Sequence, residues 1–308
     1  MRTMKLRADP PAAAGRRAVG LLGACRSLVA APPMIGSVLL MLVLLGWMGR
    51  WEVLVLLVWL TSSLVVTTRT GERIVVRVGC GFRRPTAAKA ARLIPLWSRA
   101  LRRCGIDPAD FDLYVRSSNQ SNASAGGAHS VAVTTGLLAA SRAGRLTDDQ
   151  LVAVLVRELG HHATLANRYG LVTLWLAAPW RLATRTVVGF ASALARPQPS
   201  RGLAVVIVAG IAVATGQAVQ AKQWSVALVL TGVTVAAVLC PVGDAALSRR
   251  SEFDADRYAN TSGVGADLAS ALQILGSRHV RRPGLTSRLL TRHPTIRRRI
   301  TELPRTFR

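Results

Sequence analysis

The sequence is poor in acidic residues, in lysine and in aromatic side chains, and these shortages narrow the range of functions. Fifteen Asp and Glu stand against 40 basic residues, so the formal net charge is +25. Only Lys5, Lys89 and Lys222 are lysine, a bias typical of a GC-rich genome. Aromatic residues make up 5% of the chain, and the basic stretches contain almost none, unlike single-stranded nucleic-acid platforms. We therefore expect no nucleic-acid partner.

Cysteine motifs, a nucleophile elbow and a signal-cleavage site are also missing. Cys25, Cys80, Cys104 and Cys240 form no C-x-x-C pair, which argues against a zinc cage or a disulfide framework and predicts reduced thiols. No Ser or Cys lies in a G-x-S-x-G elbow, so a serine or cysteine hydrolase is disfavoured. The first apolar run follows a basic stretch of 33 residues without a small-x-small site, so we expect no cleavable signal.

Long apolar runs predict membrane helices. Half of the residues are hydrophobic and the mean hydropathy is +0.32. Residues 202–221 and 223–243 each lack Asp, Glu, Lys and Arg, and only Lys222 separates them. A spanning helix needs roughly 20 such residues, so the two runs predict a transmembrane hairpin. Two buried helices of a soluble core are the alternative.

A second hairpin is predicted at 34–67. Each arm has about 16 residues and would be about 24 Å long. Arg50 and Glu52 would lie at the turn, with Trp47 and Trp51 at the membrane interface. The alternatives are a re-entrant hairpin or a single tilted span, and the span would bury a charge pair at considerable cost.

The distribution of basic residues predicts the topology. Residues 1–33, 69–103 and 277–308 are arginine-rich and flank the apolar runs. The positive-inside tendency places all three in the cytoplasm, where anionic lipids attract them. We therefore expect a multi-pass protein of the cell membrane with both termini cytoplasmic. Residues 171–195, with two internal arginines, are expected to lie along the interface.

Local patterns predict the elements between the membrane segments. Helices are expected at 86–103, 147–168 and 266–276, and strands at 112–118 and 130–136. Residues 119–129 are small and polar, as in a turn or an irregular edge strand. Thr147 is the predicted N-cap of the 147–168 helix.

The stretch VRELGHH at 156–162 resembles the H-E-x-x-H helix of zinc proteases, but its first histidine is replaced. In that motif two histidines one helical turn apart bind zinc, and the glutamate polarises a water molecule. Glu158 and His161 keep this spacing. Arg157 stands where the first histidine should be, and a protonated guanidinium has no lone pair to offer a metal.

A second acidic motif follows the apolar hairpin. In SRRSEFDAD, Glu252 and Asp256 lie four residues apart on one helical face. A carboxylate that completes a zinc site, with a second carboxylate orienting a histidine, is a common arrangement. Such pairs are also frequent on surface helices, but here the hairpin returns the pair to the side of Glu158.

Four blocks together resemble the integral-membrane gluzincin metalloproteases, which include the HtpX-like proteases and the CAAX prenyl endopeptidases. The blocks are SNASAGGAHSVAVTTGLL, RELGHH, SRRSEFDAD and TRHPTIRRRI, and they cover about residues 86–303 in the family order. The resemblance implies a mostly helical fold with a small edge sheet, one Zn²⁺ per chain, and cleavage of membrane or membrane-proximal proteins on the cytoplasmic side.

The resemblance also implies roles for individual residues. Glu158 would be the general base, His161 and Glu252 zinc ligands, and Asp256 the residue that orients a ligand. His293 would stabilise the oxyanion, with Arg299 assisting. The edge strand that binds substrate backbone would comprise Asn122, Ala123, Ser124 and Ala125.

The replaced ligand leaves three interpretations open. In the first, the chain is an inactive pseudoprotease in which Arg157 occupies the place of the metal, pairs with Glu252 or Glu158, and leaves a protein-binding site. In the second, His162 substitutes as a ligand, although it projects about 100° from His161. In the third, His161 and Glu252 hold metal weakly together with His129 or His293.

The sequence therefore predicts a mainly α membrane protein with two transmembrane hairpins and a cytoplasmic zincin-like helical domain with a small edge β-sheet. The function expected from the resemblance is a membrane-bound zinc metalloendopeptidase, and the alternative is the inactive binder. The predicted segments are a basic N-terminal segment at 1–33, hairpins at 34–67 and 201–247, and the two parts of the domain at 68–200 and 248–308.

Overall fold

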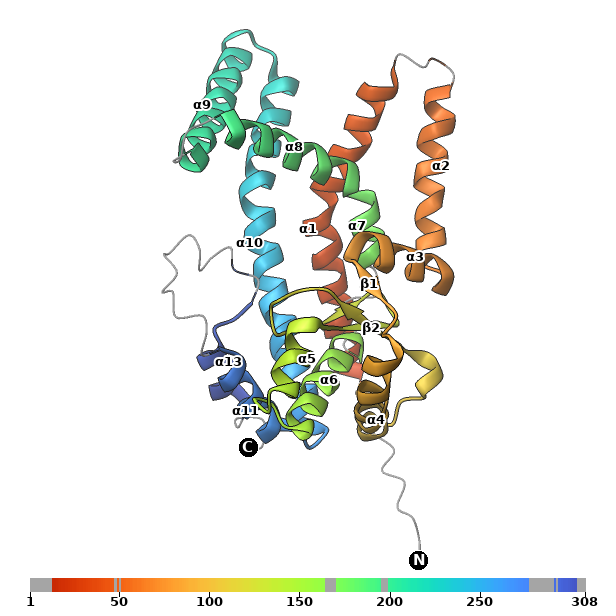
Figure 1. Ribbon diagram of the computed structural model, residues 1–308. Helices are drawn as coiled ribbons and strands as arrows, with labels where there is room; N and C mark the ends of the chain where they lie inside the picture. The colour runs from red at the N-terminus through yellow and green to blue at the C-terminus, as the bar shows by residue number, and fades with distance from the viewer. Residues whose placement is uncertain are drawn as a thin grey trace, which may run out of the picture.

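The computed structural model describes residues 13–46, 49, 51–163, 170–194, 199–276, 291 and 293–303. Long helices extend from one end of a compact domain that contains the sheet and the shorter helices (Figure 1). The long helices are α1 (Ala13–Leu45), α2 (Trp51–Val66), α9 (Pro199–Gln220) and α10 (Trp224–Thr261). The shorter helices are α3 (Arg69–Cys80), α4 (Ala87–Cys104), η2 (Pro108–Asp110), α5 (Thr135–Arg142), α6 (Asp148–Ala163), α7 (Gly170–Leu176), α8 (Ala178–Leu194), α11 (Gly265–Gly276) and α13 (Ile296–Glu302).

The first apolar hairpin is longer than predicted. Its first arm does not begin near residue 34, because α1 already starts at Ala13 and continues through Pro32 and Pro33. The stretch before these prolines is rich in Ala and Leu, which favour helix, so much of the predicted basic segment at 1–33 belongs to this arm. Glu52 lies in the first turn of α2, whereas Trp47 and Arg50 lie outside the described residues.

The described part of the chain contains one helix that is a clear candidate for a membrane span. There, Leu28–Leu45 is long and apolar enough to cross a membrane, with mean hydropathy 2.4 and 6% of the segment buried. Helices α2 and α3 together meet the same criterion but bend by 103°. Helices α9 and α10 form the second predicted helical hairpin, and its crossing of a membrane stays a prediction.

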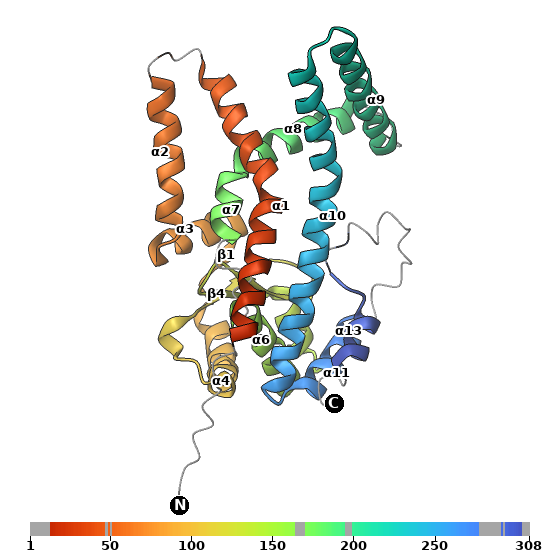
Figure 2. The same ribbon diagram turned by 180° about the vertical axis from the view of Figure 1, so that it is seen from behind.

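Helix α10 joins two segments that the sequence analysis separated near residue 247. It is continuous for 38 residues, or about 57 Å, and contains both an apolar arm and the Glu252–Asp256 pair. Residues 248–261 contain no glycine or proline, so nothing interrupts the helix at the predicted boundary. Figure 2 shows α10 beside α1 over much of its length.

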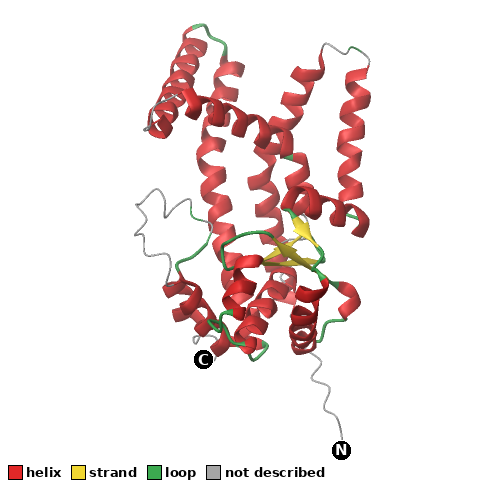
Figure 3. Ribbon diagram, in the orientation of Figure 1, coloured by secondary structure: helices red, strands yellow, loops and turns green. Residues whose placement is uncertain are grey.

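The small sheet has four strands in the order β1-β2-β4-β3. They are β1 (Phe82–Arg83), β2 (Asp112–Arg116), β3 (Ala123–Gly126) and β4 (Ser130–Thr134). The predicted strands at 112–118 and 130–136 are thus confirmed, although both end two residues earlier. They pair in parallel, and β3 pairs antiparallel to β4 at the edge. Figure 3 shows the sheet, in yellow, between the long helices and the lower helices.

Helix α6 is the centre of the domain. Every residue from Leu151 to His162 is buried, because the sheet, α4, α10 and α11 surround the helix. Its N-terminus is closed by a reciprocal capping box in which Thr147 Oγ1 accepts from the Gln150 amide, and Gln150 Oε1 accepts from the Thr147 amide. The predicted cap is therefore confirmed, and the predicted residues 164–168 lie outside the described part.

Close packing of α6 on α10 depends on Gly160. A Cβ atom at this position would lie 3.0 Å from Tyr258 Cβ and 3.1 Å from the Ala255 carbonyl. Only a glycine therefore permits this approach without displacement, which brings the residues around Glu158 next to Glu252. Helix α8 runs across the long helices (Figure 1), and the interfacial position of residues 171–195 stays a prediction.

Candidate functional site: an arginine in a degenerate zincin motif

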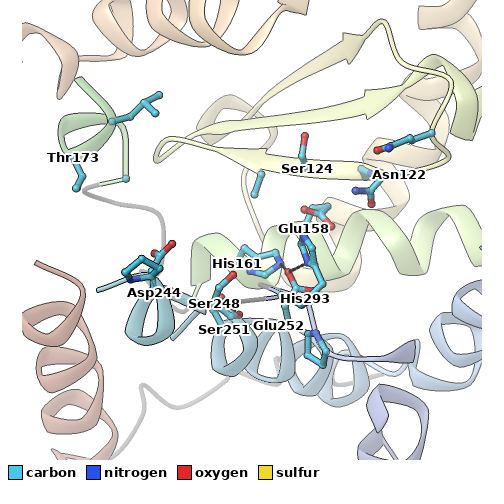
Figure 4. Close-up of a pocket in the computed structure, with 18 of the residues that line it drawn as sticks. Asn122, Ser124, Glu158, His161, Thr173, Asp244, Ser248, Ser251, Glu252 and His293 are labelled. Carbon is cyan, nitrogen blue, oxygen red and sulfur yellow. Dashed lines mark hydrogen bonds and ion pairs between the residues drawn. The ribbon is translucent and has the colours of Figure 1, made fainter. Parts of the chain in front are cut away.

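Three helical segments bring the predicted site residues together. Helix α6 contributes Arg157, Glu158 and His161, and α10 contributes Glu252 and Asp256. His293, just before α13, and Arg299 within α13 complete the cluster. Figure 4 shows Glu158, His161, Glu252 and His293 pointing toward one another below Ser124. Residues from three separate sequence blocks therefore meet in a single site.

Arg157 lies at the centre of this cluster and is 8% exposed at its side chain. Its Nη1 is 2.5 Å from Glu158 Oε1, and its Nη2 donates to Glu252 Oε2. Its Nε donates to Asp256 Oδ1 at 3.2 Å. One guanidinium thus binds three buried carboxylates, and a planar group with five N–H donors is well suited to such sharing.

Arg299 adds a second cation to the same carboxylates. Its Nε and Nη2 bind the two oxygens of Asp256 at 2.7 and 2.6 Å, a bidentate pair. Its Nη1 is 3.6 Å from Glu252 Oε2. Its guanidinium is 7% exposed and engaged with Asp256, so Arg299 ties α13 to α10. Its assistance to an oxyanion stays a prediction.

The two histidines of the cluster share one carboxylate oxygen. His293 Nδ1 is 3.1 Å from Glu252 Oε1, and His161 Nε2 is 3.7 Å from the same atom. His161 is buried, whereas the His293 side chain is 68% exposed. The imidazoles therefore flank Glu252, whose other oxygen binds Arg157.

His162 and His129 lie elsewhere. His162 Nε2 is 3.2 Å from the Ser130 carbonyl, and its ring packs edge-on against Phe111 at 5.0 Å. His129 is half-buried, with Nδ1 3.0 Å from the Asp110 carbonyl. The hypothesis that His162 replaces the missing ligand finds no geometric support, because adjacent side chains of a helix diverge by about 100°.

Burial and the central guanidinium shift the pKa values of the cluster. Burial alone would lower the pKa of Arg157, but Glu158, Glu252 and Asp256 raise it above its ordinary value. Burial raises the pKa of Glu158 against the opposing effect of Arg157. For Glu252 the raising effect of burial is outweighed, chiefly by Arg157, and its pKa is lowered. Arg157 is therefore a permanent cation whose neighbours compensate its charge.

The residues present do not fit a zinc ion. Zinc requires three protein ligands with free lone pairs, and a second cation within hydrogen-bond distance of those ligands would repel it. Arg157 already uses Glu252 Oε2, and it replaces a ligand rather than supplying one. Across the described residues, no group of three or more His, Cys, Asp or Glu could hold a metal ion.

The edge strand β3 lies above Glu158, shifted by one residue from the predicted 122–125. The Thr134 amide donates to the Asn122 carbonyl at 3.0 Å, so this pair belongs to the ladder. Hydrogen-bonded pairs alternate along an antiparallel ladder. The backbone N–H and C=O groups of Ser124 therefore point toward β4, and those of Ala123 and Ala125 point outward. The Ala125 amide interacts with the Glu158 carboxylate and lowers its pKa.

A cavity of about 2260 Å³ connects the site to the long helices. Ile35 and Leu39 of α1 and Trp180 of α8 contribute to its apolar end, and Glu158 and His293 to its polar end. The cavity therefore extends from the region of the candidate membrane span Leu28–Leu45 to the edge strand.

Glu72 is a buried functional group that the sequence analysis missed. Its carboxylate accepts from the amides of Ala128 and His129 and from Ser130 Oγ at 2.6 Å. It thereby fixes the turn between β3 and β4, and with it the position of the edge strand. A single glutamate in an arginine-rich segment carries no sequence signal for this long-range contact.

The free energy of unfolding should depend on pH through two buried imidazoles. Burial lowers the pKa of His161 to about 3 and that of His162 to about 4, against about 6.5 in an unfolded chain. At pH values between the folded and the unfolded pKa, the unfolded chain binds more protons than the folded chain. The free energy of unfolding therefore falls as the pH drops below about 6.5. We expect the melting temperature in detergent to fall by roughly 5–10 °C from pH 7.5 to pH 5.

The variant His162→Gln measures the histidine contribution to this dependence. It should reduce the pH slope, because one of the two groups no longer titrates. The raised pKa of Glu158 acts in the opposite direction, so the comparison of slopes is more informative than the wild-type curve. Equal slopes in the two proteins would contradict the assignment of His162 as a buried neutral imidazole.

Comparisons with known proteins agree with the resemblance seen in the sequence. A search of curated proteins finds no match. Among solved structures, the crystal structure of Ste24p from S. mikatae matches with 19% identity and a TM-score of 0.47, over 92% of this chain and 66% of that protein. The family model described as peptidase family M48 matches residues 87–306, more than two thirds of the chain. The chain belongs to peptidase family M48.

Proposed function

We propose that this chain is a catalytically inactive member of peptidase family M48 that binds extended protein segments at a membrane. The observation that carries the proposal is the position of Arg157, whose guanidinium binds Glu158, Glu252 and Asp256. The residues that would hold zinc and activate water in this family are thus occupied by a side chain of the protein itself.

The same ion pairs argue against use of Glu158 as a general base. A base must be free to accept a proton from water within hydrogen-bond reach. Glu158 Oε1 is 2.5 Å from the Arg157 guanidinium, and the Ala125 amide faces the carboxylate. A binding role needs none of these groups to react.

The binding site in this proposal is the outer edge of β3. An extended peptide adds to a sheet edge through main-chain hydrogen bonds, and the carbonyls of Ala123 and Ala125 face outward. The adjoining cavity is lined by apolar residues of α1 and α8, which suits a partner segment that continues into a membrane. We place the site on the cytoplasmic side of the cell membrane, with anionic lipids as neighbours of the basic segments.

Proline at position 125 provides the test. In Ala125→Pro the ladder with β4 is kept, because this amide points away from β4 toward Glu158, but the outer edge gains a ring that hinders an added strand. Fluorescent unfolded casein should bind the detergent-solubilised wild type and be recovered intact, and Ala125→Pro should weaken binding about tenfold or more. Fluorescence anisotropy measures binding, and gel electrophoresis measures cleavage.

Ala125→Val is the matched control, since it enlarges the side chain and keeps the amide. It should bind casein within about threefold of the wild type. Melting temperatures of both variants exclude unfolding as the cause of any loss. Equal binding by wild type and Ala125→Pro would remove β3 as the site, and cleavage of casein by the wild type would refute inactivity.

Family membership supports a second candidate, a zinc metalloendopeptidase acting on membrane or membrane-proximal proteins. Glu158, His161 and Glu252 keep the family spacing and meet in space. The zinc content of the wild-type protein distinguishes the two candidates, because only the metalloendopeptidase requires tightly bound zinc.

A further inference from the structure

The charges that line the cavity are unbalanced. Six arginines line it against three carboxylates, with the histidines His161 and His293 in addition. The arginines are Arg116, Arg145, Arg157, Arg181, Arg297 and Arg299, and the carboxylates are Glu158, Asp244 and Glu252. The surplus is positive even though the site itself is rich in acidic residues.

Two of these six arginines are already paired with carboxylates within the chain. Arg157 and Arg299 bind the carboxylates of the central cluster, and Asp256 behind the cavity wall adds a third carboxylate to that cluster. Arg181 and Asp244, toward the long helices, each have interactions within the chain. None of these groups is therefore available to balance the charge of a ligand without a rearrangement.

Three arginines differ from the rest. Arg116 at the end of β2, Arg145 before α6 and Arg297 in α13 are all exposed. Within the described segments, no carboxylate lies within ion-pair distance of any of the three. They share the cavity lining with the polar loop of residues 119–122 that leads into β3. We call these three residues the arginine rim.

We propose that the arginine rim recognises an acidic stretch in the extended protein segment bound along β3. This inference rests on the proposed function and names the chemistry of its ligand. A strand paired with β3 lies along the cavity that the loop at 119–122 and the rim also line. Carboxylates of that segment would neutralise guanidinium groups that have no counter-charge among the described residues.

A protein segment fits this surface better than a lipid headgroup does. The outward carbonyls of Ala123 and Ala125 are main-chain acceptors in the register of a β-strand, and they need N–H donors that a phospholipid tail does not provide. Apolar residues of α1 and α8, the β3 edge and the arginine rim all line the same cavity. An occupant must therefore combine apolar, extended and acidic parts.

Three synthetic peptides of equal length test the proposal with the full-length protein in detergent. They share a Val/Thr-rich strand and differ only in a terminal block of Glu, Gln or Lys residues. The Glu peptide should bind about tenfold more tightly than the Gln peptide, since exposed ion pairs contribute modestly and additively. The preference should shrink as the salt concentration rises.

Charge reversal in the rim is the second arm of the experiment. Arg145→Glu combined with Arg297→Glu should abolish the preference for Glu over Gln, while the Gln peptide still binds. Arg142→Glu is the matched control, because Arg142 is exposed in α5 and does not line the cavity. It should leave the preference unchanged.

The outcomes separate the two proposals. Equal binding of the Glu and Gln peptides, both lost in Ala125→Pro, would overturn the arginine rim and keep the β3 site. Failure of all peptides to bind, or binding unaffected by Ala125→Pro, would overturn the proposed function. Vesicles with anionic lipid give a third outcome. If they displace the Glu peptide and bind the wild type and Ala125→Pro equally well, the rim binds headgroups and the inference is wrong.

Discussion

Replacing Arg157 with histidine is expected to raise the zinc content from fewer than about 0.1 to about one ion per chain. Histidine at this position lies one helical turn from His161, so both imidazoles project from the same face of α6. The substitution also releases Glu252 Oε2, which Arg157 binds in the wild type. Elemental analysis of the purified wild type and variant gives the measurement.

The gain of metal should be accompanied by casein cleavage that the wild type lacks. Arg157→His with Glu158→Gln is the control, because it should keep the zinc and lose the cleavage. Arg157→Lys controls for loss of the guanidinium alone, since an ammonium group offers no lone pair and should bring no zinc. Tightly bound zinc in the wild type would overturn the inactive assignment, and unchanged zinc in Arg157→His would show that these residues do not form a latent metal site.

Removing the central cation should destabilise the protein more than any other single change in the site. Arg157→Met keeps the length and apolar stem of the side chain but leaves Glu158, Glu252 and Asp256 without it. Breaking a buried ion pair in this way costs about 3–5 kcal/mol, which corresponds to a fall in melting temperature of roughly 10 °C for a chain of this size. Thermal unfolding in detergent at pH 7.5 measures the effect.

The cause of this destabilisation is tested by changing the partners as well. Adding Glu252→Gln and Asp256→Asn to Arg157→Met should recover a large part of the melting temperature, because the uncompensated charges are gone. The loss in Arg157→Met should also be smaller at pH 5, where Glu158, whose pKa burial raises, begins to be protonated. A melting temperature within about 2 °C of the wild type would show that the ion pairs contribute little.

The sequence predicted the elements of the site because each motif carries local information. Glu158 and His161 are spaced by one helical turn, and so are Glu252 and Asp256, and apolar periodicity placed both pairs on helices. The strands β2 and β4 were predicted from their alternation, and the fit to peptidase family M48 was visible in the order of four blocks. Their approach in space was inferred from the predicted hairpin at 201–247, which returns Glu252 and Asp256 to the side of Glu158.

Predictions of boundaries and partners were less successful. The continuity of α10 and the early start of α1 depend on helical segments that contain prolines, and local rules assign breaks there. The pairing of Arg299 with Asp256, and of Glu72 with the turn between β3 and β4, joins residues 43 and 56 to 58 positions apart. No periodicity in the sequence encodes such contacts.

By itself, the sequence determined the family, the mainly helical class and the loss of the first zinc ligand, because a guanidinium cannot coordinate a metal in any fold. Only the tertiary structure decided where that guanidinium goes. Packing at Gly160 brings α6 against α10, and burial makes three carboxylates costly unless a cation lies among them. The arrangement of Arg157 among Glu158, Glu252 and Asp256 follows from this long-range packing, which spacing along the chain does not specify.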